Sequence, residues 1–385
     1  MRRSKRVQSI EPSPIRKIMD LSESIPDIIG LHVGEPDFDT PKHIVEAGCR
    51  ALQEAYTHYT HGAGLLQLRE AIARKLLEEN GIEADPKTEV TVTAGGFAAI
   101  FAAIQATIDP GDEVMILDPS WPSYAGFVRL ADGAPVSVAL RGPDFEPSRA
   151  DIEKHITDKT RMIVVNSPNN PTGSVYSSNS LLEIARLAKE HDLLVLADEV
   201  YEKIVFDDNK HFSIASRSEF KDTTIIVNSF SKTYAMTGWR LGYAVADEAI
   251  TTDIRKIHGY MVSCAPSSAQ KAGLEALSGP QDCVSEMVEE YRRRRDQIVA
   301  GLNDIDGFQC APPKGTFYAF PNVSKLGMAS AETAEELLEQ AKTACIPGSA
   351  FGEAGEGYLR LSFASSQGDI QEALTRIKTW RSQRK

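Results

Sequence analysis

The chain has 385 residues, enough for two domains with a large buried core. Its 42 basic and 54 acidic side chains give a formal net charge of −12, which argues against a general binder of nucleic acid or anionic membranes. The five cysteines are scattered and never spaced as Cys-x-x-Cys, so neither a disulfide framework nor a zinc site is expected. We expect a cytoplasmic protein, because no apolar stretch typical of a signal peptide follows the basic N-terminus and no run of about 18 apolar residues occurs.

Between about residues 89 and 246, short apolar runs alternate with helical patterns such as 97–107 and 180–190. This alternation predicts an α/β fold, with a mainly parallel sheet covered by helices on both faces. Loops at the carboxyl ends of such strands form the usual ligand crevice. The expected strands are 89–93, 113–117, 135–139, 162–166, 193–197, 224–228 and 241–245.

The pattern changes after about residue 253, where helical periodicity dominates. We expect a long amphipathic helix over 282–302, strands over 316–320 and 358–363, and a terminal helix over 369–381. These elements are typical of a smaller α+β domain. The expected division is an N-terminal arm over 1–44 that joins the small domain, a large domain over 45–285 and the small domain over 286–385.

The segment from Ser229 to Arg240 carries the most specific chemical signal. Lys232 lies between two hydroxyl residues, and Arg240 follows eight residues later. A lysine amine forms an imine with an aldehyde, and pyridoxal phosphate carries both an aldehyde and a phosphate. Residues at the two ends of this segment can therefore hold the phosphate while Lys232 presents its amine to the aldehyde. An exposed loop with an ordinary surface lysine is the alternative interpretation.

Polar residues also follow two of the expected strands. Asp198 ends the strand 193–197, where a carboxylate can face a cationic pyridine nitrogen and keep it protonated. Tyr201 can donate a hydrogen bond to the phenolic oxygen of the same ring, and Asn170 can do so from the loop after 162–166. A helix N-cap for Asp198, packing for Tyr201 and a plain turn around Asn170 explain these residues equally well.

Three further features suggest ligand contacts. Trp121 can stack on a cofactor ring, although a core tryptophan is as plausible. Gly95 and Gly96, followed by Phe97, join a strand to a helix and can bring N–H groups to a phosphate. Neither the dinucleotide fingerprint nor the Walker motif is present. Arg360 can bind a carboxylate through two parallel hydrogen bonds, or simply face solvent. No metal site is expected.

Taken in order, these segments resemble the class I/II aminotransferases of PLP fold type I, in the branch that includes aspartate and aromatic transaminases. The resemblance covers nearly the whole chain and implies the fold of that family, with a seven-stranded sheet in the large domain. It rests on residues 33–41, Tyr59, 68–71, Gly95, Gly96, Trp121, 169–173, 198–201, 229–240, 315–318 and Arg360.

The resemblance implies a role for each matching position. Lys232 would be the Schiff-base lysine and the carrier of the proton. The resemblance also implies a homodimer, in which Tyr59 reaches the phosphate of the neighbouring subunit. The remaining roles are phosphate binding by Gly95, Gly96, Phe97, Ser229 and Arg240, pairing of Asp198 with the ring nitrogen, hydrogen bonds from Tyr201 and Asn170 to the phenolic oxygen, stacking by Trp121, and substrate binding by Gly34, Asn170 and Arg360.

The implied reaction has two halves. An amino acid gives its nitrogen to pyridoxal phosphate, and a second oxo acid, expected to be 2-oxoglutarate, takes it from pyridoxamine phosphate with ping-pong kinetics. Another enzyme of the same fold, such as a carbon–sulfur β-lyase or an aminocyclopropane carboxylate synthase, is the alternative. A non-catalytic regulator and a nucleotide-binding oxidoreductase have less support in the motifs.

Two departures from the pattern of the family leave the preferred substrate side chain open. Some aspartate-specific relatives have a lysine at the position of Phe97, and others use an arginine of the partner subunit near the position of Tyr260. Neither charge is present in this chain. This weakens a strict aspartate assignment, although Ser13, Arg16 or Lys17 can compensate. Aspartate, aromatic, alanine-like and broad specificity are all left open.

Overall fold

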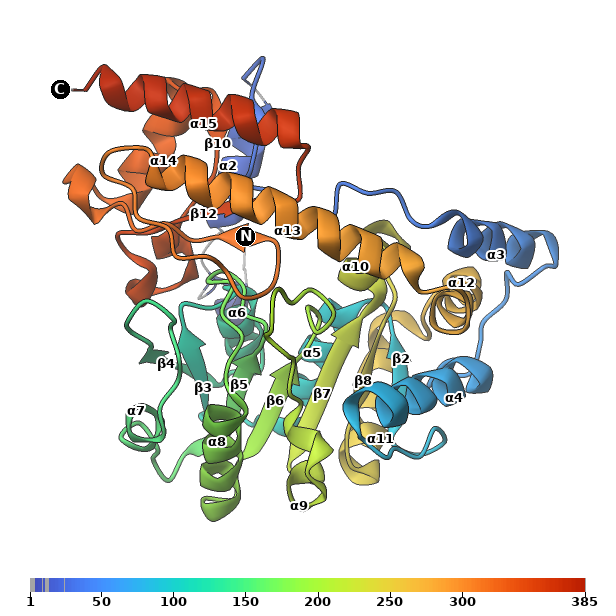
Figure 1. Cartoon of the computed structure of the whole chain (residues 1–385). Helices are drawn as coiled ribbons and strands as arrows, with labels where there is room; N and C mark the ends of the chain where they lie inside the picture. The colour runs from blue at the N-terminus through green and yellow to red at the C-terminus, as the bar shows by residue number, and fades with distance from the viewer. Residues whose placement is uncertain (1–3, 9, 11–13, 24, 385) are drawn as a thin grey trace.

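The computed structural model describes residues 4–8, 10, 14–23 and 25–384. Its centre is a seven-stranded sheet with the order β2–β8–β7–β6–β5–β3–β4 (Figure 1). Four neighbouring pairs are parallel, whereas β8 is antiparallel to both β2 and β7. The strands are β2 (Val90–Thr93), β3 (Glu113–Asp118), β4 (Ala134–Ala139), β5 (Thr160–Asn166), β6 (Leu194–Asp198), β7 (Thr224–Ser229) and β8 (Gly242–Val245).

Helices cover the sheet because its central strands are apolar on both faces. One apolar cluster joins the sheet to α5 (Gly96–Thr107), α6 (Ser123–Leu130) and α11 (Glu248–Val262). A second cluster joins it to α7 (Arg149–Glu153), α8 (Ser178–Glu190) and α9 (Ser218–Lys221). The Ser177 side chain caps α8 by accepting a hydrogen bond from the backbone of Ser180. This layered arrangement confirms the expected α/β fold.

A third group of helices packs beside the antiparallel edge of the sheet. It consists of α3 (Lys42–Gln53), α4 (Leu66–Lys75), which continues into a π-helical turn (Leu76–Asn80), and α12 (Ser267–Ser278). The short α10 (Phe230–Thr233) directly follows β7. In the part of the chain that the structure describes, no helix is both long and apolar enough to cross a membrane.

The smaller part of the molecule lies above the carboxyl ends of the strands in Figure 1. It contains α13 (Asp282–Asn303), α14 (Ser330–Glu339), α15 (Gln367–Ser382) and an antiparallel sheet of β11 (Ile346–Pro347), β12 (Leu359–Ser362) and β9 (Tyr318–Ala319). The N-terminal segment adds α2 (Pro14–Glu23) and β1 (Ile29–Gly30), which pairs with β10 (Thr343–Ala344). The short α1 (Lys5–Gln8) instead contacts α6 beside the large sheet. The expected boundary after residue 285 falls inside α13, and the proposed division into domains stays a prediction.

Candidate active site

A cavity with a volume of about 350 Å³ opens where the parallel strands end beneath β12. It collects eleven of the residues singled out in the sequence: Gly34, Gly96, Phe97, Trp121, Asn170, Asp198, Tyr201, Ser229, Lys232, Arg240 and Arg360. They come from the N-terminal segment, the start of α5, the loops after four strands, and β12. The topology therefore brings together residues that lie far apart in the sequence.

Lys232 lies in α10 with its amine inside the cavity. Its Nζ donates a 2.6 Å hydrogen bond to the carbonyl oxygen of Gly34. A side chain at residue 34 would collide with the hydroxyl of Tyr318. Only glycine therefore allows the backbone at this position to lie so close to Lys232. Burial lowers the pKa of Lys232 to about 8, with the Glu35 carboxylate opposing this shift and Arg360 adding to it. A surface lysine is thereby excluded.

Asp198 ends β6 and is almost fully buried. Its Oδ2 accepts a 2.6 Å hydrogen bond from the hydroxyl of Tyr124, and its Oδ1 accepts one of 3.3 Å from the backbone of Val200. Burial raises the pKa of Asp198 to about 6, although the hydrogen bond from Tyr124 works in the opposite direction. A cation placed beside this carboxylate would favour its ionised form.

Arg360 projects from β12 and is only 3% exposed, so the solvent-facing alternative is wrong. Its Nη1 donates to Oδ1 of Asn170 at 3.0 Å, and its Nη2 donates to the carbonyl oxygen of His32 at 2.8 Å. The guanidinium carbon lies 4.4 Å from the ring centre of Tyr318 and 4.9 Å from that of Phe351. Its buried Nε has no hydrogen-bond partner among the described residues. A carboxylate would satisfy this cation.

Tyr201 and Tyr318 meet above the strand ends, with their hydroxyl oxygens 2.9 Å apart. The backbone N–H of Asn170 donates to Oδ1 of Asn166, whose Nδ2 donates to the carbonyl oxygen of Asp198. Cis peptide bonds precede Pro119, Pro168 and Pro171. The turn at residues 169–173 is therefore tied to the strand that carries Asp198.

The opposite end of the cavity is suited to an anion. Gly95 has a φ of 84° and precedes α5, whose first two residues, Gly96 and Phe97, line the cavity. The first N–H groups of a helix have no partner within it and can bind an anion. A Cβ at Gly95 would lie 2.5 Å from Nη2 of Arg240, and one at Gly96 would lie 3.3 Å from Cβ of Ser229. Both glycines thus leave room for the cation and the hydroxyl. Gly95 itself is outside the cavity lining, behind Arg240.

Two expected positions lie elsewhere in the single chain. Tyr59 is 86% exposed and Tyr260 is 90% exposed, and neither lines the cavity. Arg16 pairs with Asp20 and Lys17 with Glu335, so the arm directs both cations away from the cavity. Ser13 lies outside the described residues.

Several lining residues had no assigned role in the sequence analysis. Tyr124 lies three residues after Trp121, but no motif marks it as the partner of Asp198. Glu35 and Tyr318 belonged to segments of the resemblance without a stated contact. The same holds for Val33, Val200, Ser231 and Thr237. The remaining lining residues reach the cavity through tertiary structure that sequence spacing does not reveal; they are Ile15, Met19, His32, Ile100 and Asn166.

These features define a buried amine, a carboxylate and a guanidinium around one cavity, with an anion-binding end, as in enzymes that bind pyridoxal phosphate. The family model for aminotransferase class I and II matches residues 26–377. The chain belongs to this family, is an aminotransferase and uses pyridoxal phosphate.

Relatives named for aspartate and for aromatic amino acids have similar sequence identity to this chain. The aspartate aminotransferase of Pyrococcus abyssi is 44% identical over 98% of each chain. The aromatic-amino-acid aminotransferase 2 of Thermococcus litoralis is 43% identical over 97% of each chain. The solved structure of Pyrococcus protein-A1 matches with a TM-score of 0.97 and 44% identity over 98% of each chain. The fold is thus that of the family, but identity alone does not select the substrate.

Proposed function

We propose that Lys232 carries the chemistry of this aminotransferase and that the amino-group donor has an apolar or aromatic side chain. The observation that supports the first part is the buried Lys232 amine in the same cavity as Asp198 and Arg360. Its pKa of about 8 leaves roughly a fifth of the amine neutral at pH 7.4, far more than for a lysine in water. A neutral amine is both the nucleophile and the base that transamination requires.

The residues around the cavity fit pyridoxal phosphate. The phosphate would be held by the N–H groups at Gly96 and Phe97, the hydroxyl of Ser229 and the guanidinium of Arg240, which Gly95 accommodates. The remaining ring contacts would come from Asp198 at the ring nitrogen, from Tyr201 and Asn170 at the phenolic oxygen, and from Trp121 against the ring face.

Bound pyridoxal phosphate supplies an electron sink that weakens the C–H bond at the α-carbon of the amino acid. Arg360, with Asn170 beside it, would bind and orient the α-carboxylate through parallel hydrogen bonds. Lys232 would then take the α-proton at Nζ and return it to a neighbouring carbon. The buried setting around Lys232 and Arg360 would exclude water from this transfer.

The charges of the cavity support an apolar donor side chain. Its lining contains three strongly basic residues, Lys232, Arg240 and Arg360, and each already has a proposed partner. Burial, followed by the charge of Arg360, lowers the pKa of His32 to about 4, so this ring is neutral. Within the described lining no cation is left for a second carboxylate, and the carboxylate of Glu35 would repel one.

Apolar side chains occupy the remaining wall. Ile15 and Met19 of α2 face the cavity together with Phe97, Ile100 and Trp121. The rings of Phe97 and Trp121 meet edge to face with centroids 5.4 Å apart. Such a surface gains free energy by burying an aliphatic or aromatic side chain, by about 25 cal/mol per Å² of apolar area. A donor of the phenylalanine, tyrosine or leucine type therefore has more support than aspartate.

We also propose 2-oxoglutarate as the acceptor, on the resemblance alone. Its second carboxylate would have to be met by neutral hydrogen-bond donors, because the three basic residues of the lining are committed. A donor screen with 2-oxoglutarate tests both substrates at once. Glutamate formation supports transamination, whereas ammonia and pyruvate from a cysteine-type donor would instead support the β-lyase alternative.

The decisive experiment concerns Lys232. Borohydride reduction of the cofactor-loaded enzyme should attach the cofactor to Lys232, as peptide mass spectrometry would show. Lys232→Ala should lose at least about 10⁴-fold in kcat, because nucleophile and base disappear together. An unlabelled Lys232, or a Lys232→Ala variant as fast as its parent, would contradict the proposal. Lys271→Ala, at a half-buried lysine of α12 outside the cavity, is the matched control.

We further propose a cytoplasmic homodimer. Tyr59 and Tyr260 are large aromatic side chains with nearly full exposure in one chain, which supports their burial against a second copy. All five cysteines are free, which supports a reducing compartment. Sedimentation equilibrium should give twice the 42.1 kDa chain mass. A monomer at micromolar concentration would contradict the dimer.

A further inference from the structure

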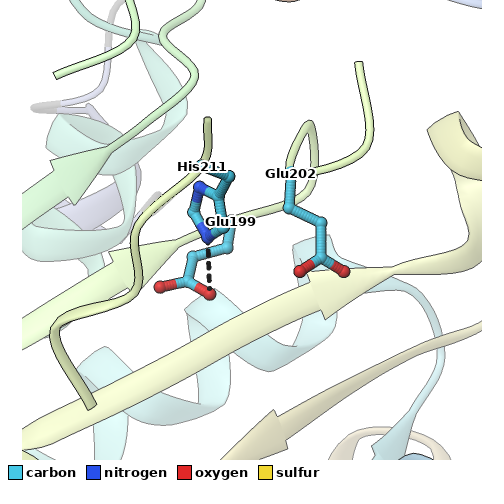
Figure 2. A group of neighbouring side chains, drawn as sticks. All are labelled: Glu199, Glu202 and His211. Atoms are coloured by element: carbon cyan, nitrogen blue, oxygen red, sulfur yellow. Dashed lines mark ion pairs between the residues drawn. The ribbon is translucent and has the colours of Figure 1, made fainter. Parts of the chain in front are cut away.

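A buried group of charged side chains lies next to the turn that carries Asp198 and Tyr201. It consists of Glu199, Glu202 and His211 (Figure 2), with one ligand-type atom from each within 4.8 Å of the others. Their side chains are 5%, 5% and 7% exposed. None of the three lines the cavity. Buried charges are costly unless they are paired, so this group requires an explanation.

Glu202 connects the turn to three other places in the fold. Its Oε1 accepts hydrogen bonds from Nδ2 of Asn228 at 2.8 Å and from the amine of Lys75. Its Oε2 accepts one of 2.8 Å from Asn80. Asn228 in turn accepts a 2.7 Å hydrogen bond from the backbone N–H of Ser229. One carboxylate thus links the turn after β6 to the end of β7, where the phosphate-binding end of the cavity begins.

Glu199 and His211 form the other half of the group. Figure 2 shows the ring directed at the carboxylate, with Nε2 of His211 3.2 Å from Oε2 of Glu199. The contact is an ion pair without the alignment of a hydrogen bond, and these two atoms have no other hydrogen-bond partner among the described residues. The backbone N–H of Glu199 donates to Val227 at 2.9 Å, which fixes the carboxylate beside β7.

The charges decide between a metal ion and a proton. Two carboxylates face one ammonium, that of Lys75, so one positive charge is missing. The ammonium of Lys75 is already paired with Glu202, and it would repel a divalent cation bound there. A proton on His211 supplies the missing charge with the atoms present. Burial lowers the pKa of His211, but Glu199 and Glu202 outweigh it and the pKa is raised above 6.5.

We propose that His211 is a buried imidazolium whose ion pair with Glu199 holds the turn 198–202, which makes His211 a positioning residue for transamination. The inference rests on the proposed roles of Asp198 and Tyr201. The groups that face His211 are Glu199, Glu202 and Lys75. Deprotonation of His211 would leave Glu199 as an unpaired buried charge and loosen the turn.

The ionic state can be measured without the cofactor. In the apoprotein, ¹⁵N resonances of the His211 ring, assigned by their loss in His211→Gln, should show both nitrogens protonated at pH 6.5. Glu199→Gln should lower the midpoint of that titration, because it removes the adjacent negative charge. A neutral ring at pH 6.5, or a stoichiometric divalent ion in the purified protein by elemental analysis, would overturn the proposal. These results do not depend on the role of Lys232.

The positioning role has its own measurement. His211→Gln should weaken binding of pyridoxal phosphate to the apoprotein and lower kcat, each by about tenfold or more, with KM for the amino acid within about twofold, because Arg360 is untouched. His155→Gln, at a histidine beside α7, is the matched control and should match the parent. Should His211→Gln fail to fold, Glu199→Gln is measured in its place.

If His211 had only a structural role, the pH dependence of cofactor affinity would be the same in the parent and in His211→Gln. As pH rises through the pKa of His211, the affinity of the parent for pyridoxal phosphate should fall relative to that of His211→Gln, because only the parent loses an imidazolium, whereas both proteins share the titration of Lys232. With a raised pKa, the stabilising charge is present at low pH and lost at high pH. Equal pH profiles in parent and variant, or unchanged affinity and kcat, would overturn the proposal.

Discussion

The hydroxyl of Tyr124 donates a 2.6 Å hydrogen bond to Oδ2 of Asp198, in a setting where both side chains are almost fully buried. This bond stabilises the ionised carboxylate that would face the cofactor ring. Removing it with Tyr124→Phe should weaken cofactor binding roughly tenfold, because a hydrogen bond to a charged group contributes about 1.5 kcal/mol or more. Fluorescence titration of the apoprotein with pyridoxal phosphate measures the change.

Tyr176→Phe is the matched control for Tyr124→Phe. Tyr176 is 1% exposed, and its hydroxyl has no hydrogen-bond partner among the described residues. Its removal should leave cofactor affinity at the parent value. Equal affinities for the two variants would show that the contact between Tyr124 and Asp198 contributes nothing to binding.

The lowered pKa of Lys232 predicts how the rate of cofactor binding depends on pH. Because its pKa is about 8 rather than 10.5, the neutral amine forms as pH rises through 8. The rate at which the apoenzyme combines with pyridoxal phosphate should therefore rise with a midpoint near pH 8, as stopped-flow absorbance would show. Glu35 raises the pKa of Lys232, so Glu35→Gln should move the midpoint lower. A midpoint near 10.5 would contradict the desolvation argument.

Arg360 should act on every amino acid alike. Arg360→Lys keeps the charge but loses the planar pair of donors, so kcat/KM should fall by about a hundredfold, or roughly 2.7 kcal/mol. The loss should be the same for alanine and phenylalanine, because only the carboxylate is affected. Arg376→Lys, at a half-buried arginine of α15 outside the cavity, should leave kcat/KM at the parent value. A loss that depends on the side chain of the substrate would argue against this role.

Phe97 is the position at which the side-chain preference can be altered. Phe97→Lys would place a cation in an apolar wall, so the ratio of kcat/KM for aspartate over phenylalanine should rise by about tenfold, or 1.4 kcal/mol. Phe97→Leu removes the ring without adding charge and should leave aspartate no better a substrate. If both variants gain aspartate activity equally, charge is not the determinant.

The sequence alone predicted the strands that consist of a single apolar run. Each of the seven expected strands occurs in the central sheet, because a run of buried β-branched and aliphatic residues such as Val90–Thr93 has few alternatives. The two-residue strands Ile29–Gly30 and Thr343–Ala344 were not expected, since they exist only through pairing with each other. Such short elements depend on tertiary contacts that carry no period in the sequence.

The same distinction holds for the cavity. Residues inside recognisable motifs, such as Lys232 and Arg240, were found from the sequence and do lie together. Tyr124 and Met19 were missed because their place at the cavity follows from how helices pack, and no spacing encodes it. Glu199 and His211 were missed for a further reason, since their charges compensate only after folding.

The hydrogen bond between Arg360 and Asn170 joins β12 to the loop after β5. A primary amine without a carboxyl group would reach Lys232 yet offer nothing to the guanidinium, so it would engage only one side of the enzyme. If Arg360 binds the α-carboxylate as proposed, the enzyme discriminates between amino acids and biogenic amines, because a molecule without a carboxylate cannot contact both sides of the cavity at once.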